Sequence, residues 1–164
     1  MVTQFPCEKC GKCCTRLEQE EHNGISLFPW ETHLFPEKEI EPSLGLGKPD
    51  TSGFKTILYT YTAPNCSHLE DHQCKIHTQR PLVCRSYPFR VRHQGEITIY
   101  IVAPECTKIQ NWPETKTVDK RYAEMDAAEL IGDHLSRFYK AQEPKWRYIS
   151  GKGWTQIGRN KPGE

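Results

Sequence analysis

The sequence has neither a long hydrophobic run nor an excess of charge of either sign. Its longest apolar stretch lies around residues 97–103, whereas a helix that crosses a bilayer needs about 20 apolar residues. Lysine and arginine number 22 against 21 aspartate and glutamate residues, so the net charge is +1. Such a balance provides no basic field for nucleic acid. We therefore expect neither a membrane nor a nucleic-acid partner.

Several signatures of catalysis are also missing. Gly45 and Gly47 follow no predicted strand, and the third glycine of a dinucleotide-binding turn is absent. The sequence contains no Cys-x3-Cys-x2-Cys motif of radical enzymes, and nothing in it marks a serine–histidine–acid triad. No residue is therefore assigned a catalytic role from the sequence.

Hydrophobic residues are scarce as well. They make up 36% of the 164 residues, below the share of about 45–50% in typical domains, and the mean hydropathy is -0.73. The length suits one domain, but its apolar core is expected to be modest. Bound metal would compensate, because the binding free energy of a site that exists only in the folded state adds to the folding free energy.

The chain is rich in cysteine, of which it has eight. The residues before Cys7 lack the charged region and the apolar run of a signal peptide, so we expect a cytoplasmic protein. Thiols stay reduced in the cytoplasm. The eight cysteines are therefore interpreted as metal ligands rather than as disulfide partners.

Four of the cysteines form a compact cluster, Cys7-x2-Cys10-x2-Cys13-Cys14. Two-residue spacers let successive thiolates turn inward onto one centre, and Gly11 lets the backbone curl tightly. The spacing is similar to the ligand loop of bacterial ferredoxins, and it would serve a zinc site equally well. Because adjacent side chains diverge, we expect Cys13 and Cys14 to serve different centres.

The other four cysteines are spread over forty or so residues, and no spacing among them closes a site by itself. At least one centre is therefore expected to take ligands from both clusters. Eight thiolates make two four-ligand sites, or one cluster and one smaller site, and the sequence leaves this division open. The predicted metal ligands are Cys7, Cys10, Cys13, Cys14, Cys66, Cys74, Cys84 and Cys106.

Arginines and aromatic residues accompany the second cluster. Arg80 and Arg85 are predicted to bind a cofactor, and Arg90 lies close by. One role for these arginines is to bond backbone carbonyls and balance thiolate charge, and another is to bind an anionic ligand such as a carboxylate. Tyr87 and Phe89 are expected to form a dry wall around the metal, which tunes its potential and stability.

Three histidines lie among these cysteines. His77 follows Cys74 by three residues, so it is either a metal ligand or, as we favour, a residue that supports a thiolate or packs in the core. His68 and His72 flank an acidic loop, and we expect both at the surface.

Hydrophobic periodicity predicts an α+β fold. Period-two patterns indicate strands, and steps of three or four indicate a helix. We predict a small irregular domain, with a β-hairpin and one or two helices around a cysteine-rich metal core over residues 1–142, and a basic, glycine-rich tail over 143–164. The expected elements are helices over 29–35 and 118–140, a loop over 36–53, a strand over 54–62, a hairpin from 89–92 and 96–102, and a short helix from Pro81 to Cys84.

The ordered motifs resemble a known family, the YkgJ-type CxxCxxCC family of zinc- or iron-chelating proteins, over about residues 5–106. The resemblance implies metal chelation. The flagellin lysine N-methylases carry a similar domain, which implies an iron–sulfur cluster, S-adenosylmethionine, a protein substrate or partner, and protein lysine N-methyltransferase activity. The motifs are Cys7-x2-Cys10-x2-Cys13-Cys14 and Cys74-x-Ile76-His77-x2-Arg80-Pro81-x2-Cys84-Arg85-x-Tyr87-Pro88-Phe89.

Three functions follow from these patterns. The first is an iron–sulfur protein whose [4Fe-4S] cluster includes Cys10 and Cys13. The second is a structural zinc module that binds a partner without catalysis, because closed all-thiolate zinc sites are structural. The third, a dithiol redox protein using Cys10 with Cys7 or Cys13, lacks the strand-then-helix context of thioredoxin.

Overall fold

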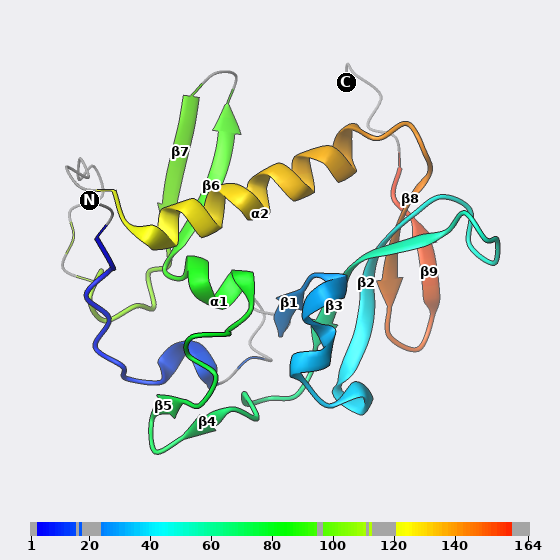
Figure 1. The fold of residues 1–164 in the computed structure, drawn as a ribbon. Coiled ribbons are helices and arrows are strands. Elements are labelled where there is room, and N and C mark those ends of the chain that lie inside the picture. The colour runs from blue at the N-terminus through cyan, green and yellow to red at the C-terminus, as the bar shows by residue number, and fades with distance from the viewer. Residues whose placement is uncertain are drawn as a thin grey trace.

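The computed structural model describes residues 3–15, 17, 24–94, 97–110, 112 and 121–158, which include all eight cysteines. The strands pair in three antiparallel sheets, and helices connect some of them (Figure 1). In chain order the elements are η1 (Lys12–Cys14), β1 (Ile25–Leu27), η2 (Pro29–Leu34), η3 (Glu37–Glu39), β2 (Ile40–Leu46), β3 (Lys55–Tyr61), β4 (Leu69–Glu70), β5 (Gln73–Cys74), α1 (Leu82–Ser86), β6 (Phe89–Gln94), β7 (Ile97–Val102), α2 (Ala123–Lys140), β8 (Lys145–Ile149) and β9 (Gly153–Gln156).

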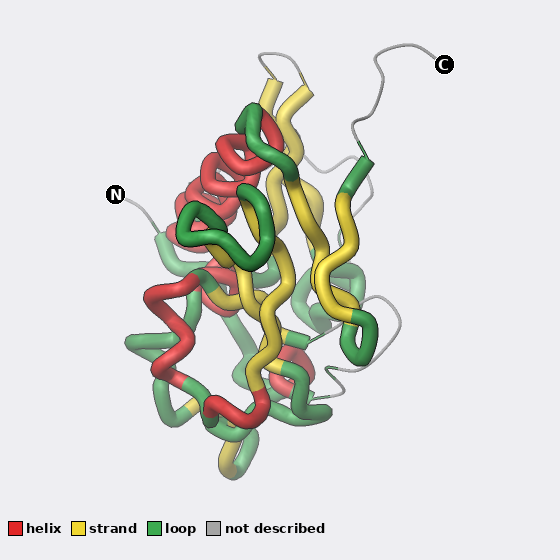
Figure 2. Tube along the Cα trace, turned by 90° about the vertical axis from the view of Figure 1, so that its right-hand side faces the viewer, coloured by secondary structure: helices red, strands yellow, loops and turns green. Residues whose placement is uncertain are grey.

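The largest sheet has five strands in the order β1-β3-β2-β8-β9. Helix α2 runs across the molecule above α1 and beside the β6–β7 hairpin, and it packs against both α1 and β6 (Figure 1). A view turned by 90° shows the strands of the sheet beside the helical layer (Figure 2). The predicted α+β class is therefore confirmed. No described helix is long and apolar enough to cross a bilayer.

The prediction of a loop over 36–53 was wrong for its first half, which forms η3 and β2. Pro42 and Gly45 indicated a loop in the sequence. The register of β2 against β3 shifts on either side of Leu44, and this irregularity accommodates the proline at a strand position. At Gly45, a Cβ atom would lie 2.3 Å from Cζ of Phe54. The glycine therefore marks close ring packing within the sheet.

Helix α2 begins at Ala123, after the predicted start at 118, and residues 118–120 lie outside the described ranges. Tyr122 has an extended backbone and pairs with Thr3, whose carbonyl accepts a 3.0 Å hydrogen bond from Ala123 N–H. The helix therefore starts where this bridge ends. The predicted apolar stripe is confirmed, because Met125 and Phe138 are buried.

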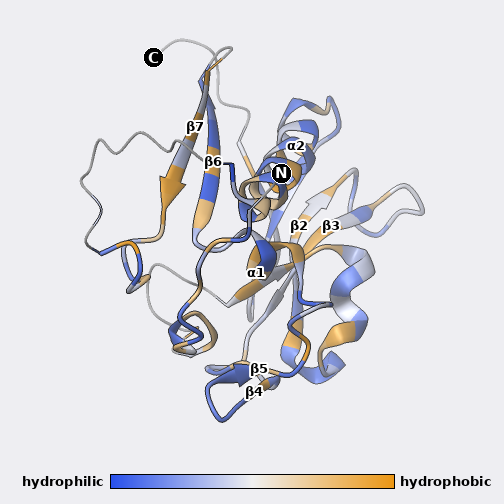
Figure 3. Ribbon diagram, turned by 60° about the vertical axis from the view of Figure 1, so that its left-hand side comes forward, coloured by the Kyte–Doolittle hydropathy of each residue, from blue (hydrophilic) through white to orange (hydrophobic). Residues whose placement is uncertain are grey.

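The predicted hairpin is confirmed as β6 and β7, although its turn at residues 95 and 96 lies outside the described ranges. The predicted division into residues 1–142 and 143–164 remains a prediction. Residues 145–156 of that tail contain β8 and β9, which extend the five-stranded sheet from β2. The β4–β5 hairpin consists mostly of hydrophilic residues (Figure 3).

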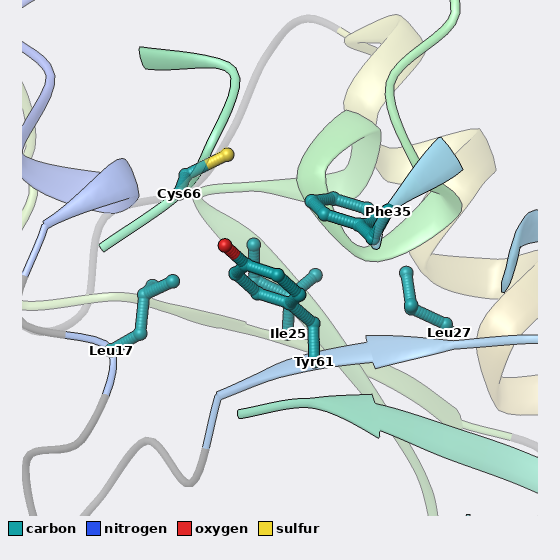
Figure 4. Packing of buried hydrophobic residues seen from close by; sticks show 6 residues of the cluster. All are labelled: Leu17, Ile25, Leu27, Phe35, Tyr61 and Cys66. Carbon is teal, nitrogen blue, oxygen red and sulfur yellow. The ribbon is translucent and has the colours of Figure 1, made fainter. Parts of the chain in front are cut away.

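Three apolar clusters form the core. One lies between the sheet and α2 and contains Leu44, Leu82 and Phe138. A second joins the N-terminal segment to α2 and β6. The third contains Cys66 (Figure 4). Cys14 and Cys84 pack on it, so it lies directly against the cysteines. These three small clusters, one of which lies against the cysteines, make the modest core that the composition predicts.

Candidate metal centre

All eight cysteines line one cleft, with a volume of about 540 Å³. They reach it from the N-terminal loop, the connection between β3 and β4, the β4–β5 hairpin, α1 and the turn after β7. None of the eight forms a disulfide. The fold therefore brings both cysteine clusters to a single place, although about fifty residues separate them in the chain.

The N-terminal cysteine loop is fixed at its start and bent in its middle. Buried Glu124, in the first turn of α2, accepts a 3.0 Å hydrogen bond from Phe5 N–H. Lys9 and Gly11 have φ angles of 51° and 72°, in the left-handed region that glycine adopts most easily. These two bends curl the loop, and Cys14 N–H then closes a 2.9 Å turn onto Gly11 O.

Two backbone hydrogen bonds join the clusters. Cys66 N–H donates to Cys14 O at 2.9 Å, and Leu17 N–H donates to Pro64 O at 2.8 Å. The buried ring of Tyr61 lies under this junction, beside Cys66 (Figure 4). The two sequence clusters are therefore neighbours in the protein backbone as well as across the cleft.

A tight hairpin and a short helix present the next two cysteines. Asp71 and His72 both have positive φ angles, of 48° and 62°, as in a two-residue type I′ turn. This turn pairs Leu69 with Cys74. Cys84 lies in α1, whose start follows Pro81 as the sequence predicts.

Buried Glu31 of η2 positions α1 from the other side of the core. One carboxylate oxygen accepts a 2.7 Å hydrogen bond from Leu82 N–H, and the other accepts a 2.9 Å bond from Phe28 N–H. Leu82 is the first residue of α1. Glu31 thus fixes the helix that carries Cys84. A glutamate three residues into a helix predicts a local cap, but no pattern in the sequence predicts its second contact fifty-one residues away.

Replacing Glu31 with alanine should lower the free energy of unfolding by at least about 2 kcal/mol, because two buried N–H groups lose their acceptor at about 1–3 kcal/mol each. Urea unfolding of the metal-loaded protein measures the change. Glu37→Ala, at an exposed position in η3, is the control and should have little effect. Equal effects of the two substitutions would contradict the role of Glu31.

Five of the thiols form one electrostatic group. Burial raises the pKa of the Cys84 thiol, and charge at Cys13, Cys66 and Cys74 raises it further. Burial is also the main cause of the raised pKa of Cys74, on which Cys66 and Cys13 act as well. Cys14 is hydrogen-bonded to Cys13 and Cys66. The five-thiol group is therefore Cys13, Cys14, Cys66, Cys74 and Cys84.

The other three thiols, Cys7, Cys10 and Cys106, gather at the turn after β7. Burial raises the pKa of Cys106, and charge at Cys7 and Cys10 adds to the effect. Thr107 Oγ1 lies 3.8 Å from Cys10 Sγ and 3.2 Å from Glu8 Oε2. Both this three-thiol group and the five-thiol group combine cysteines of the first sequence cluster with later ones.

Hydrogen bonds within the five-thiol group favour thiolates. The bond from Cys14 is the largest cause that lowers the pKa of Cys13 to about 7 and that of Cys66 to about 6. The same bonds raise the pKa of Cys14. Thiolates are the form of cysteine that binds metal. The group therefore holds two thiols ready for coordination near neutral pH.

Cys13 and Cys14 do not diverge, contrary to the sequence-based expectation, because their Sγ atoms lie 3.9 Å apart. Tetrahedral coordination at about 2.3 Å places ligand sulfurs about 3.8 Å apart, so this pair already has the spacing of one edge of such a site. Within the described ranges, however, no three Cys, His, Asp or Glu side chains are arranged to hold an ion. Coordination by three or more thiols requires other sulfurs to move inward.

The predicted arginines separate in the structure. Arg80 lines the cleft, whereas exposed Arg85 does not. The assignment of Arg85 to a cofactor therefore stays a prediction. Nε of Arg80 and the hydroxyl of Tyr87 are buried, and neither has a hydrogen-bond partner among the described residues. Two buried donors and eight thiols fit a metal centre with acceptor sulfurs.

The histidines differ from one another. His77 lines the cleft, and the charge of Arg80 lowers its pKa. His72 lines the cleft from the exposed tip of the β4–β5 hairpin. The surface prediction was wrong for His68, which is half-buried, packs edge-on against Phe35 and donates from Nε2 to Leu34 O at 2.6 Å. Its role is to hold this loop to η2.

A protein-family model matches residues 6–114, and its description is "CxxCxxCC: Putative zinc- or iron-chelating domain". The chain belongs to the CxxCxxCC family. The resemblance drawn from the cysteine spacing is confirmed. The matched span contains all eight cysteines and ends before α2. No curated protein and no solved structure matches the chain.

Proposed function

We propose that this CxxCxxCC protein binds iron in its cysteine cleft, as an iron–sulfur cluster. The observation that supports this choice is the shared cleft of about 540 Å³ lined by all eight thiols. That volume lies within the range of about 300–1,000 Å³ of cofactor-sized sites, whereas an all-thiolate zinc site closes around its single ion.

We propose the five-thiol group as the binding site of the cluster. It supplies more than the four thiolates that a [4Fe-4S] cluster requires, and two of its members have lowered pKa values. The three-thiol group then forms the smaller site. The sequence-based pairing of Cys10 and Cys13 in one cluster stays a prediction. The effect of charge at Cys10 on the pKa of Cys106 supports the alternative, in which Cys10 serves the smaller site.

Zinc is the second candidate, and the separation of 3.9 Å between the sulfurs of Cys13 and Cys14 fits a tetrahedral zinc site. Zinc accepts the same thiolates as iron at tetrahedral spacing. In that case the protein is a structural module that binds a partner. S-adenosylmethionine binding, lysine methylation, a protein substrate and a cytoplasmic location remain predictions that rest on the family likeness and the sequence.

Anaerobic purification followed by an absorption spectrum and assays of iron, sulfide and zinc tests the proposal. A brown protein with broad visible absorption that bleaches on reduction, and with matching iron and sulfide, would support it. A colourless protein with stoichiometric zinc, after expression with abundant iron and cluster-assembly proteins, would contradict the iron proposal and favour the zinc module.

A further inference from the structure

Two buried hydrogen-bond donors in the cleft wall have no acceptor. They are the hydroxyl of Tyr87 and Nε–H of Arg80, neither of which has a partner within the described part of the chain. Both residues line the cysteine cleft. Buried polar groups in native proteins are almost always paired, so an exception requires an explanation, of which a bound ion is one.

The surroundings of Tyr87 indicate the chemistry of a partner. Charge at Glu105, Cys106, Cys13 and Cys10 acts on its phenol, so three thiols lie near it, from both thiol groups. A phenol carries its proton at neutral pH and is available as a donor. The charge of Arg80 likewise acts to lower the pKa of three thiols, those of Cys13, Cys74 and Cys84. Both donors therefore lie among sulfurs, and Cys13 is common to their surroundings.

The hydroxyl of another buried tyrosine, Tyr61, is hydrogen-bonded within the chain. Tyr61 donates to Asn65 O at 3.1 Å and accepts from Ser67 N–H at 3.2 Å. Tyr87 has neither kind of contact. The Tyr87 hydroxyl therefore has no acceptor within the described chain. A thiolate sulfur that moves inward when metal binds would be a fitting acceptor.

We propose that the Tyr87 hydroxyl and the Arg80 Nε–H donate hydrogen bonds to sulfur atoms of the bound metal centre. The inference rests on the proposed iron–sulfur function. Hydrogen bonds to the sulfurs are among the factors that set the potential of an iron–sulfur centre, and a donor next to sulfur stabilises the more negative, reduced state. Tyr87 and Arg80 are therefore residues that raise the potential, in addition to forming the wall.

Two conservative variants remove the donors. Tyr87→Phe deletes the hydroxyl and keeps the ring, and Arg80→Lys keeps the positive charge and deletes Nε. Tyr148→Phe and Arg147→Lys are the matched controls, because both residues lie in β8 and do not line the cleft. The full chain is purified anaerobically, and its potential is measured by redox titration followed in the visible spectrum.

We expect both cleft variants to be reduced at a more negative potential than the wild type, and both controls at the wild-type potential. Resonance Raman spectra should show iron–sulfur bands that shift in D₂O, with a smaller shift in the two cleft variants. Wild-type potentials and D₂O shifts in cleft variants that hold the full iron and sulfide would overturn the proposal. So would loss of the centre together with loss of the fold, whereas loss of the centre from a folded variant would support it.

Failure of the proposed function gives a different result. A colourless wild type with zinc contradicts the iron proposal, and the donors are then tested by zinc affinity, which should weaken in the cleft variants and not in the controls. Unchanged zinc affinity would overturn the donor roles. A saturable change of the wild-type spectrum with acetate, lost in Arg80→Lys, would assign Arg80 to an anion and overturn its half of the proposal.

Discussion

The Cys84→Ser substitution should leave the protein with less than about a tenth of the wild-type iron. We expect the same of Cys13→Ser. Both thiols belong to the five-thiol group, and even the residues that support metal ligands change affinity by about 10- to 100-fold when replaced. Serine differs by one atom, so the fold can form around it. Iron and sulfide per chain, after anaerobic purification, measure the effect.

Cys7→Ser and Cys106→Ser are the comparison, because these thiols belong to the three-thiol group. They should retain most of the iron. Cys10→Ser separates the two arrangements of ligands. If it removes as much iron as Cys13→Ser, one cluster spans both groups and the proposed division is wrong. If no single serine variant loses iron, the cleft is not the iron site.

Removing the metal should lower the melting temperature by about 10 °C or more under reducing conditions, because binding free energy at such sites is folding free energy. The thiols come from segments that are distant in the sequence. Cys66 belongs to one apolar cluster, on which Cys14 and Cys84 pack. Without metal, this cluster would lose the proposed metal–thiolate crosslinks between the N-terminal loop, the β4–β5 hairpin and α1.

Thermal unfolding with and without a chelator, followed by circular dichroism, measures this dependence. The Cys84→Ser variant is the control, because it should melt at the lower temperature with or without the chelator. An unchanged transition in the wild type would show that the three apolar clusters are sufficient for the fold.

The sequence predicted the elements whose apolar residues repeat regularly. The strand β3, the β6–β7 hairpin and the stripe of α2 were all recognised from periodicity. Strand β2 was missed because Pro42 and Gly45 interrupt its pattern. The register shift beside the proline and the packing of Phe54 and Trp154 against the glycine explain these two residues. Local signals of this kind do not report contacts with distant rings.

The candidate site was predictable in composition and not in arrangement. The cysteine spacing predicted the metal ligands and the family, and the match of the family model confirms the family. The division into five and three thiols could not be predicted, because it depends on which turns face each other across the cleft. The buried acceptors Glu31 and Glu124 were missed for a related reason. Each bonds a backbone N–H far along the chain, and no sequence pattern marks such a contact.

X-ray absorption at the metal edge of the anaerobically purified full chain tests the central claim most directly, because it reports the atoms around the metal. The account predicts bound iron with a first shell of sulfur and a second shell of iron, as a thiolate-bound cluster requires. A first shell of oxygen or nitrogen, or metal bound in equal amount after all eight cysteines are replaced by serine, would contradict it.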